Sequence, residues 1–276
     1  MSVDVTTSAP KVLPSVARRV RKSDEAQRDR MLGMLSPVIL FIVWEILARL
    51  HWIDTRFFPA PSSIAGTFSQ LTLNGVLLSN TWASLQRLFF GIIIGGIPAL
   101  LLGLLMGLYR PIRAAIDPLI AATYPIPKSA ILPLILLIFG LGEPSKIAMV
   151  AIGMFYPVVI NTTVGVMQID KIYFDVGRNF GANRRQTFIT IALPGALPFI
   201  MTGIKLGVGM GLILIAIAEM IGAQSGLGFM IWNAWQILQV NTMYVGLITI
   251  AIIGFIFTAI LNEIERRLIP ARAERT

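Results

Sequence analysis

Six stretches of mainly apolar residues, each about 20 residues long, dominate this sequence. A run of about 20 apolar residues is the length that a helix needs to cross the hydrocarbon core of a bilayer. Only 13% of the 276 residues are charged, whereas soluble domains carry about 25% charged residues. The predicted spans are residues 31–50, 88–109, 118–141, 147–168, 197–221 and 244–262. The sequence therefore predicts an all-α membrane protein with six transmembrane helices.

The loop charges predict the orientation of these helices. With a cytoplasmic N-terminus, 17 lysines and arginines lie in the inner tails and loops, and four lie outside. Positive residues collect on the cytoplasmic side of membrane proteins, so both termini are expected in the cytoplasm. The four outer residues in this arrangement are Arg49, Arg56, Arg87 and Lys146.

The same reading divides the chain into four parts. Residues 1–30 and 268–276 are predicted cytoplasmic basic tails, and residues 79–267 form the main transmembrane domain. Residues 31–78 hold the first span and a helix on the outer interface, for which Ser62 or Ser63 is a suitable N-cap.

Three ionisable residues fall inside the predicted spans, where charges are costly and mark candidate functional sites. Lys128 lies in the third span, which is interrupted by prolines, and Lys205 and Glu219 lie in the fifth. Fourteen residues correspond to about 21 Å along a helix, so Lys205 and Glu219 cannot pair within one helix. We expect Lys205, Glu219 and Lys128 to be candidates for a translocation path. Lys205 could instead contact a carbonyl or a carboxylate, and Lys128 could extend to the inner interface.

The loop between the fourth and fifth spans contains "DVGRNFGANRRQTFITIALPGALP", residues 175–198. Ile172, Val176 and Phe180 recur every four residues and share one face of a predicted helix. Asp175 is expected near the N-terminus of that helix, where the dipole favours a carboxylate. Gly181 permits a turn that a side chain would hinder, and Pro194 suits the first turn of the next helix.

This loop resembles the EAA loop of binding-protein-dependent ABC importer permeases. Asp175-Val176-Gly177 stands where that motif has Glu-Ala-Ala, and Gly181, Ile191, Leu193 and Pro194 follow at the motif's spacings. The segments "YPIPKSAILPLILLIFGLGEPSK" and "PGALPFIMTGIKLGVGMGLILIAIAEMIGAQSGLG" are similar to the same family, in particular to its nitrate, taurine and alkanesulfonate branch. The likeness covers roughly residues 60–270.

The resemblance implies the type I importer permease architecture, with residues 79–267 as the permease domain. It implies a multi-pass protein of the bacterial inner membrane, a permease homodimer and a periplasmic solute-binding protein as partner. A cytoplasmic coupling helix between spans 4 and 5 would dock on a separate ABC ATPase subunit. The coupling-loop residues implied are Asp175, Val176, Gly177, Phe180, Gly181, Ala182, Arg184, Ile191, Leu193 and Pro194. The cargo expected from this branch is a small anionic solute.

The chain itself is not expected to be an enzyme. It lacks the G-x-x-x-x-G-K-[ST] phosphate loop, so ATP and Mg²⁺ are expected on the partner ATPase. No catalytic residue, metal site or cofactor is predicted in this chain, and its basic residues do not form the aromatic-interleaved face that nucleic acid requires.

Two other function classes fit parts of the pattern. A stand-alone secondary transporter or channel would use the loop only as a lipid anchor, and inverted repeats would favour it. A membrane enzyme would need a catalytic set of residues.

The charge asymmetry yields a direct test of orientation. A reporter enzyme that is active only in the cytoplasm, fused after Thr276, is expected to be active. A second reporter enzyme, active only after export, is expected to be inactive at the same position. If only this second reporter were active, the predicted topology would be contradicted.

Overall fold

The structure, a computed structural model, describes residues 15–269, and within that range it is helical without strands. The predicted all-α architecture is therefore confirmed. The predicted tails lie partly outside the described residues, and residues 15–30 belong to the first helix. The helices are α1 (Ser15–Arg49), α2 (Pro61–Leu73), α3 (Val76–Leu108), α4 (Arg110–Thr123), η1 (Lys128–Ile131), α5 (Leu132–Phe139), α6 (Glu143–Met167), α7 (Lys171–Asn179), α8 (Arg184–Thr187), η2 (Phe188–Ala192), α9 (Leu193–Gly222), α10 (Leu227–Gln236) and α11 (Val240–Leu268). The chain divides into two compact units, up to Ser63 and from Ile64 onward.

In the first unit, a carboxylate of α1 caps the start of α2. Glu45 accepts hydrogen bonds from Ser62 N at 3.0 Å and from Ser62 Oγ at 2.8 Å, and Arg49 Nε donates to it at 2.6 Å. The prediction that Ser62 or Ser63 is the N-cap was wrong, because α2 already begins at Pro61. The amide of Ser62 has no partner within α2, and Glu45 accepts the hydrogen bond that an N-cap side chain would otherwise accept.

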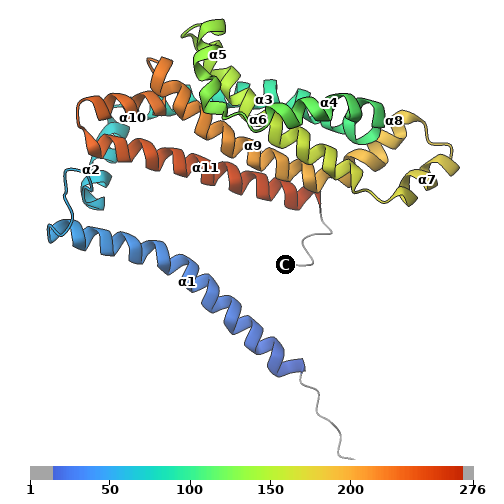
Figure 1. Cartoon of the computed structure of the whole chain (residues 1–276). Helices are drawn as coiled ribbons and strands as arrows, with labels where there is room; N and C mark the ends of the chain where they lie inside the picture. The colour runs from blue at the N-terminus through green and yellow to red at the C-terminus, as the bar shows by residue number, and fades with distance from the viewer. Residues whose placement is uncertain (1–14, 270–276) are drawn as a thin grey trace, which may run out of the picture. The chain divides into compact units, whose positions relative to one another are not determined.

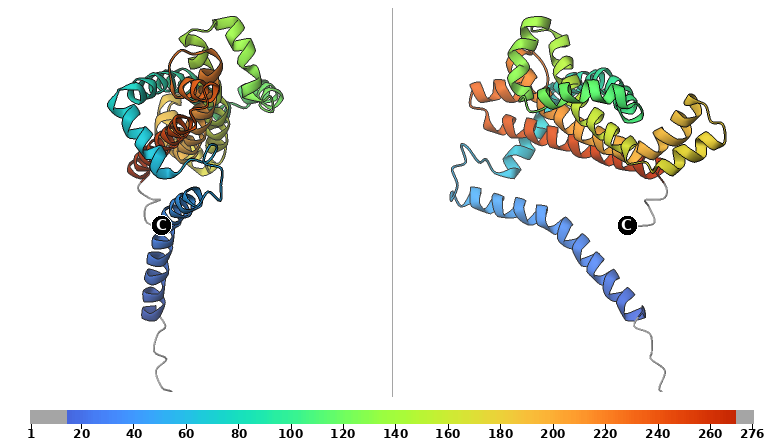
Figure 2. Two further views of the ribbon diagram at one scale, coloured as in Figure 1. Left: turned by 90° about the vertical axis from the view of Figure 1, so that its left-hand side faces the viewer. Right: turned by 45° about the vertical axis from the view of Figure 1, so that its right-hand side comes forward.

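In the second unit, α3, α6, α9 and α11 run side by side as one bundle (Figures 1 and 2). α7 and α8 lie at one end of this bundle, and α5 and α10 lie at the other end. Among residues 15–269, five helical stretches are long and apolar enough to cross a membrane, and one of them, 31–49, belongs to the first unit. The predicted third span, 118–141, which prolines interrupt, falls in a bent pair of helices: residues 110–123 and 128–139 meet at 87°. Pro125 and Pro127 lie in that break and cannot continue a helix. The six predicted spans thus correspond to five apolar helical stretches and one bent pair.

Small residues let the central helices approach closely. A Cβ added at Gly95 of α3 would overlap the backbone of Ala151 in α6, and one at Gly203 of α9 would lie 2.8 Å from the carbonyl oxygen of Pro157. Further glycines with the same tight contact to α6 are Gly91, Gly103 and Gly107 on α3, and Gly207 on α9. Membrane helices associate through such small-residue faces, because lipid provides no hydrophobic drive between them. α6 is consequently the central helix, with α3 and α9 packed against it.

α3 begins well before the predicted start of its span at residue 88. Its first turns carry polar residues, among them Asn80, Ser84 and Arg87, which lowered the hydropathy of that segment. Ser84 and Arg87 are nevertheless buried. Polar side chains buried in a bundle need partners, and these residues find them in α6, in α9 and in the loop before α10.

Candidate functional site

The loop after α6 folds into a capped helix. α7 begins after Asp170, whose carboxylate accepts a hydrogen bond from Ile172 N at 3.1 Å. Asp170 therefore occupies the N-cap position. The expectation that Asp175 lies near the N-terminus was wrong, because Asp175 lies in the middle of α7.

A glycine turn ends α7. Gly181 has a φ of 71°, in the left-handed region. Its amide donates to Arg178 O at 3.0 Å, and the Ala182 amide donates to Gly177 O at 2.9 Å. These two bonds form the Schellman motif, in which the left-handed residue is most often glycine. The predicted turn at Gly181 is thus a helix C-cap.

α7 presents two different faces. Ile172, Val176 and Phe180 lie on the side predicted from their spacing, and they are 60%, 47% and 88% exposed. The other side carries Lys171, Phe174, Asp175 and Arg178, which follow the i, i+3, i+4, i+7 pattern of one helical face. Three large apolar side chains exposed on one short helix are typical of an interaction surface.

The chain then re-enters the bundle through α8 and η2. Asn183 and Gln186 form a capping box, with bonds of 2.9 and 2.8 Å between the side chain of each and the amide of the other. η2 is a π-helical turn that leads into α9, where Pro194 occupies the first turn as predicted. A Cβ on Gly177 would lie 2.8 Å from Ile191 Cδ1. Ile191, the isoleucine of the motif, therefore packs against α7 at the position of Gly177.

The remaining residues of the predicted loop lie within the same continuous segment. Ala182 and Leu193 are half-buried, and Arg184 is exposed. Leu193 packs against a buried cluster formed by α3, α6 and α9. This packing fixes the α9 end of the segment to the bundle, whereas Ile172, Val176 and Phe180 stay exposed.

A cavity of about 390 Å³ brings together two of the three intramembrane charges. Lys128 of η1 and Lys205 of α9 both line it, together with Asn161 of α6 and the rings of Tyr124 and Tyr156. The rest of its lining is mainly apolar. Ligand sites typically combine apolar walls with a few polar groups of this kind.

Lys128 is held at the break between α4 and η1. Its Nζ donates to the carbonyl oxygens of Thr123 at 2.9 Å and of Tyr124 at 3.0 Å, and it lies 4.0 Å from the ring centroid of Tyr156. These are carbonyls at the end of α4, which lack helical partners. Two of the three donors of the ammonium are thus bonded, and the aromatic face of Tyr156 lies beside the same group.

Lys205 forms an ion pair with Glu265 of α11. Its side chain is 25% exposed and still lines the cavity. Of the partners considered for Lys205, the neighbouring carboxylate is the one observed. The pair is neutral as a whole, which leaves Lys128 as the uncompensated positive charge of the cavity.

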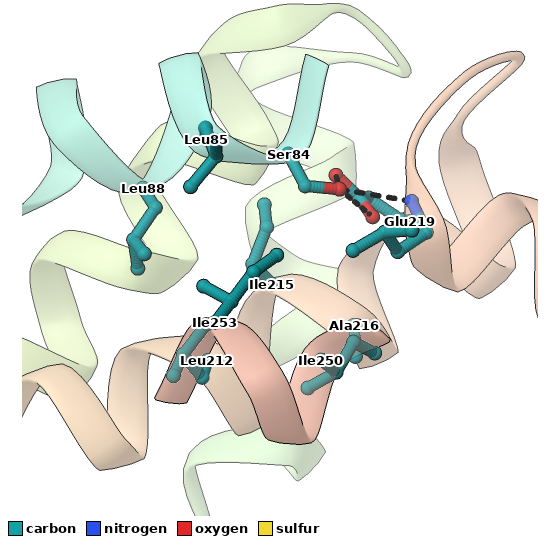
Figure 3. A pocket seen from close by; sticks show the side chains of 10 residues that line it. Ser84, Leu85, Leu88, Leu212, Ile215, Ala216, Glu219, Ile250 and Ile253 are labelled. Atoms are coloured by element: carbon teal, nitrogen blue, oxygen red, sulfur yellow. Dashed lines mark hydrogen bonds between the residues drawn. The ribbon is translucent and has the colours of Figure 1, made fainter. Parts of the chain in front are cut away.

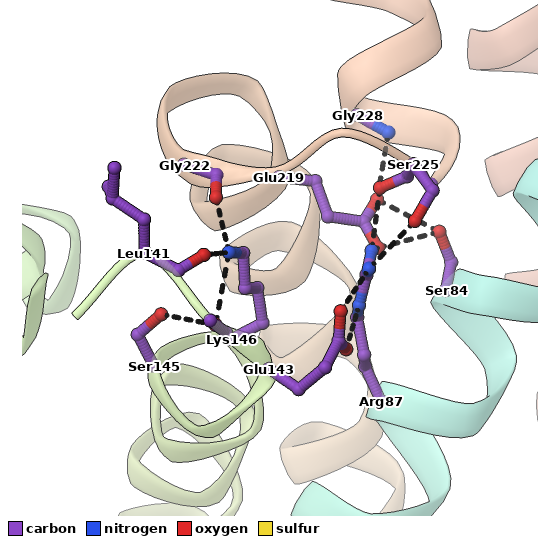
Figure 4. Close-up of polar contacts among 12 residues, drawn as sticks. Ser84, Arg87, Leu141, Glu143, Ser145, Lys146, Glu219, Gly222, Ser225 and Gly228 are labelled. Atoms are coloured by element: carbon purple, nitrogen blue, oxygen red, sulfur yellow. Dashed lines mark hydrogen bonds and ion pairs between the residues drawn. The ribbon is translucent and has the colours of Figure 1, made fainter. Parts of the chain in front are cut away.

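Glu219 lies elsewhere, in a buried ion network near the loop before α10 (Figure 4). It is 0% exposed. Its carboxylate accepts hydrogen bonds from Arg87 Nη1 at 2.8 Å and from Gly228 N at 2.9 Å, and Ser84 Oγ lies 2.8 Å from both oxygens. The only cavity that Glu219 lines among those described has a volume of about 10 Å³ (Figure 3), about enough for one water. In Figure 3, Glu219 and Ser84 point toward each other at one end of it.

Arg87 is the centre of this network. It forms two parallel bonds to Glu143 of α6, at 2.6 and 2.7 Å, and it donates to Ser225 O at 2.7 Å. Lys146 lies nearby and donates to the carbonyl oxygens of Leu141 and Gly222. Assigning Arg87 and Lys146 to outer loops was wrong, because they lie within α3 and α6, where both side chains are buried. Asn80, Ser84 and Arg87 lie on one helical face of α3, and this polar stripe is the signal in the sequence that could have revealed the site.

Within residues 15–269, no group of three or more His, Cys, Asp or Glu side chains could hold a metal ion.

Comparison with known proteins places these features in context. Residues 99–270 match the family model of the binding-protein-dependent transport system inner membrane component. The putative aliphatic sulfonates transport permease protein of Bacillus subtilis is 33% identical over 273 residues, covering 99% of this chain and 98% of that protein. The taurine transport system permease protein of Escherichia coli is 33% identical, covering 94% and 96%. The nitrate import permease protein of Synechocystis is 31% identical, covering 84% and 87%.

A solved structure has a similar fold. A chain of the MetNI methionine ABC transporter, in an inward-facing conformation, superposes with a TM-score of 0.54 and 21% identity. The match covers 70% of this chain and 96% of that chain.

The buried network yields a prediction on stability. Glu219→Leu is expected to lower the free energy of unfolding by about 1–3 kcal/mol, because Arg87 keeps Glu143 as its charge partner but the buried donors that bonded Glu219 are left unsatisfied. The double variant Arg87→Met/Glu219→Leu is expected to be more stable than Glu219→Leu, since the buried guanidinium is then absent and Glu143, which loses its partner, has a side chain that is 60% exposed. Thermal or denaturant unfolding in detergent measures both.

A matched control is Glu263→Gln on α11, which breaks exposed ion pairs to Arg266 and Arg267 and should cost at most about 1 kcal/mol. The single variant Arg87→Met completes the comparison. If the loss of unfolding free energy in the double variant equalled the sum of the losses in the two single variants, Arg87 and Glu219 would not be energetically coupled.

Proposed function

The chain belongs to the family of binding-protein-dependent transport system inner membrane components, and from this premise we propose that it passes a small anionic solute across the inner membrane. It is a permease component of an ABC transporter. In this proposal, ATP with Mg²⁺ is hydrolysed by a separate ATPase subunit, and a periplasmic solute-binding protein delivers the cargo. The permease acts as a homodimer.

The exposed apolar face of α7 carries this proposal. Ile172, Val176 and Phe180 lie on a helix that is capped at both ends and is fixed to the bundle through α8 and α9. A rigid helix with such a face can transmit a movement of a bound partner directly to the spanning helices. We assign this face as the seat of the ATPase subunit, and residues 170–194 as the coupling loop.

The cavity between η1, α6 and α9 supports the choice of cargo. Its one uncompensated charge is the ammonium of Lys128, next to two tyrosine rings and apolar walls. Such a lining suits one anionic group joined to a small apolar body. The relatives named for aliphatic sulfonates, taurine and nitrate carry solutes of this size class. The proposed path therefore includes Lys128 and Lys205, and Glu219 has the separate role of holding together the end of the bundle near α10.

Gly181 provides the test of the coupling loop. Gly181→Leu is expected to insert in the membrane and to lose at least half of the co-purifying ATPase, because a leucine disfavours the left-handed conformation by about 1–2 kcal/mol and adds bulk beside the docking face. Membrane insertion and the yield of ATPase after affinity purification are the two measurements.

Gly75 is a matched control for this variant. Its φ is 77°, and like Gly181 it has open space around the position of a Cβ, but it lies between α2 and α3. Gly75→Leu carries the same backbone strain and should retain the ATPase. Normal ATPase co-purification and normal uptake with Gly181→Leu would overturn the docking assignment.

Lys205 provides the test of the path. Lys205→Met is expected to lower uptake of the anion severalfold without loss of assembly, and Lys205→Glu is expected to lower it further, because a negative charge beside Glu265 repels an anion in a medium of low dielectric constant. ATP-driven uptake into proteoliposomes with the matched binding protein measures the effect.

Glu265→Gln separates an anion contact from a structural ion pair. It removes the same pair but keeps the ammonium, so uptake should stay near that of the wild type. Equal losses in Lys205→Met and Glu265→Gln would make Lys205 a structural residue.

A further inference from the structure

A second and larger pocket lies on the other face of α7. Its volume is about 650 Å³, and its walls come from the ends of α3 and α6, the start of α4, and from α7 and α8. The floor is apolar, with side chains such as Val166 and Phe174. The charged residues that line it are Arg113, Lys171, Asp175, Arg178 and Arg184.

The charge of this pocket is not balanced. Four cations and one carboxylate line it, and within the described part of the chain none of the four cations forms an ion pair. Arg113 is half-buried on α4, whereas Arg178 and Arg184 come from α7 and α8. Like charges held around one space repel each other, and an anion that enters the space removes this repulsion.

The two faces of α7 separate this pocket from the ATPase seat. Lys171, Phe174, Asp175 and Arg178 face the pocket. Ile172 and Val176, which form the proposed ATPase seat, do not line it. An acidic side chain of an ATPase bound on the outer face would have to pass around the helix to reach these arginines. The occupant therefore reaches the pocket from the face of α7 that is turned toward the bundle and not from the ATPase seat.

The position of the pocket indicates the occupant. α3 ends at Leu108 and α6 at Met167, and both residues line the pocket. Because α3 and α6 are long enough to cross the membrane, their ends lie at the level of the lipid headgroups. Tyr109, also in the lining, is a residue type enriched at that level. An apolar floor with a cationic rim matches an acyl chain joined to a phosphate.

We propose that this pocket binds the phosphate-bearing headgroup of an anionic phospholipid, which bridges Arg113 of α4 and Arg178 of α7. Basic pockets at the ends of spanning helices bind such headgroups in membrane proteins. The lipid then supports the coupling helix from the membrane side. This consequence for coupling rests on the proposed function, whereas the binding itself does not.

The test uses the full-length protein in nanodiscs of phosphatidylcholine with a rising fraction of phosphatidylglycerol. Native mass spectrometry after gentle delipidation counts the phosphatidylglycerol that stays bound. Arg113→Gln/Arg178→Gln is expected to weaken retention, by about fivefold for each charge removed. Retention equal to that of the wild type would overturn the proposal.

The charge-matched control is Arg110→Gln/Arg185→Gln. Both arginines are exposed and do not line the pocket. Arg110 lies on α4, like Arg113, and Arg185 lies on α8, next to Arg184. This control should retain phosphatidylglycerol like the wild type. Equal weakening in the two double variants would mean that only the general surface charge attracts the lipid, and it would overturn the site.

Two further arms distinguish other occupants. If millimolar inorganic phosphate displaced the lipid fully, the site would be a phosphate site and not a lipid site. Suppose that Arg113→Gln/Arg178→Gln bound less ATPase than the wild type, equally in nanodiscs with and without phosphatidylglycerol, and retained as much phosphatidylglycerol as the wild type. The pocket would then be an ATPase contact and not a lipid site. Gly181→Leu should keep its lipid, so failure of the ATPase assignment and failure of the lipid assignment give different results.

Discussion

The close approach of α3 and α9 to α6 is the constraint on which the rest of this structure depends. Helices in lipid gain nothing from hiding apolar side chains from each other, so they must gain from close packing. Gly95 and Gly203 leave no room for a side chain at these contacts. The buried pair of Arg87 and Glu219 acts on the same helices at one end of the bundle. Close packing fixes the distances between the helices, and the charge network fixes their register.

The functional surfaces occupy places that this packing leaves open. The break between α4 and η1 places the ammonium of Lys128 beside α6 and α9, where a cavity remains. At the end of the bundle away from α5 and α10, α7 stands outside the bundle and connects to α9 through α8 and η2. Since α9 also carries Lys205, a force on α7 acts on a helix that lines the proposed path. In the fold, the proposed coupling loop and the cavity therefore share one helix, α9.

Much of this arrangement follows from local sequence. The spans were predictable because hydropathy needs no knowledge of partners, and the faces of α7 were predictable because Ile172, Val176 and Phe180 have helical spacing. Arg87 was not assigned correctly, because its burial depends on Glu219 and Ser225, 132 and 138 residues away. The prolines before Lys128 indicated a break, but the 87° angle depends on packing. The Lys205–Glu265 pair likewise joins two helices whose register no local pattern contains.

The central claim is that one face of α7 seats the ATPase and the opposite face does not. The chain contains no cysteine, so single thiols can be introduced without a background. The rate of labelling by a membrane-impermeant maleimide, measured with and without the bound ATPase, shows how far the ATPase shields each thiol. The account predicts protection by the ATPase for Ile172→Cys, Val176→Cys and Phe180→Cys, and unchanged labelling for Lys171→Cys and Arg178→Cys. Equal labelling of the first three with and without the ATPase would contradict it.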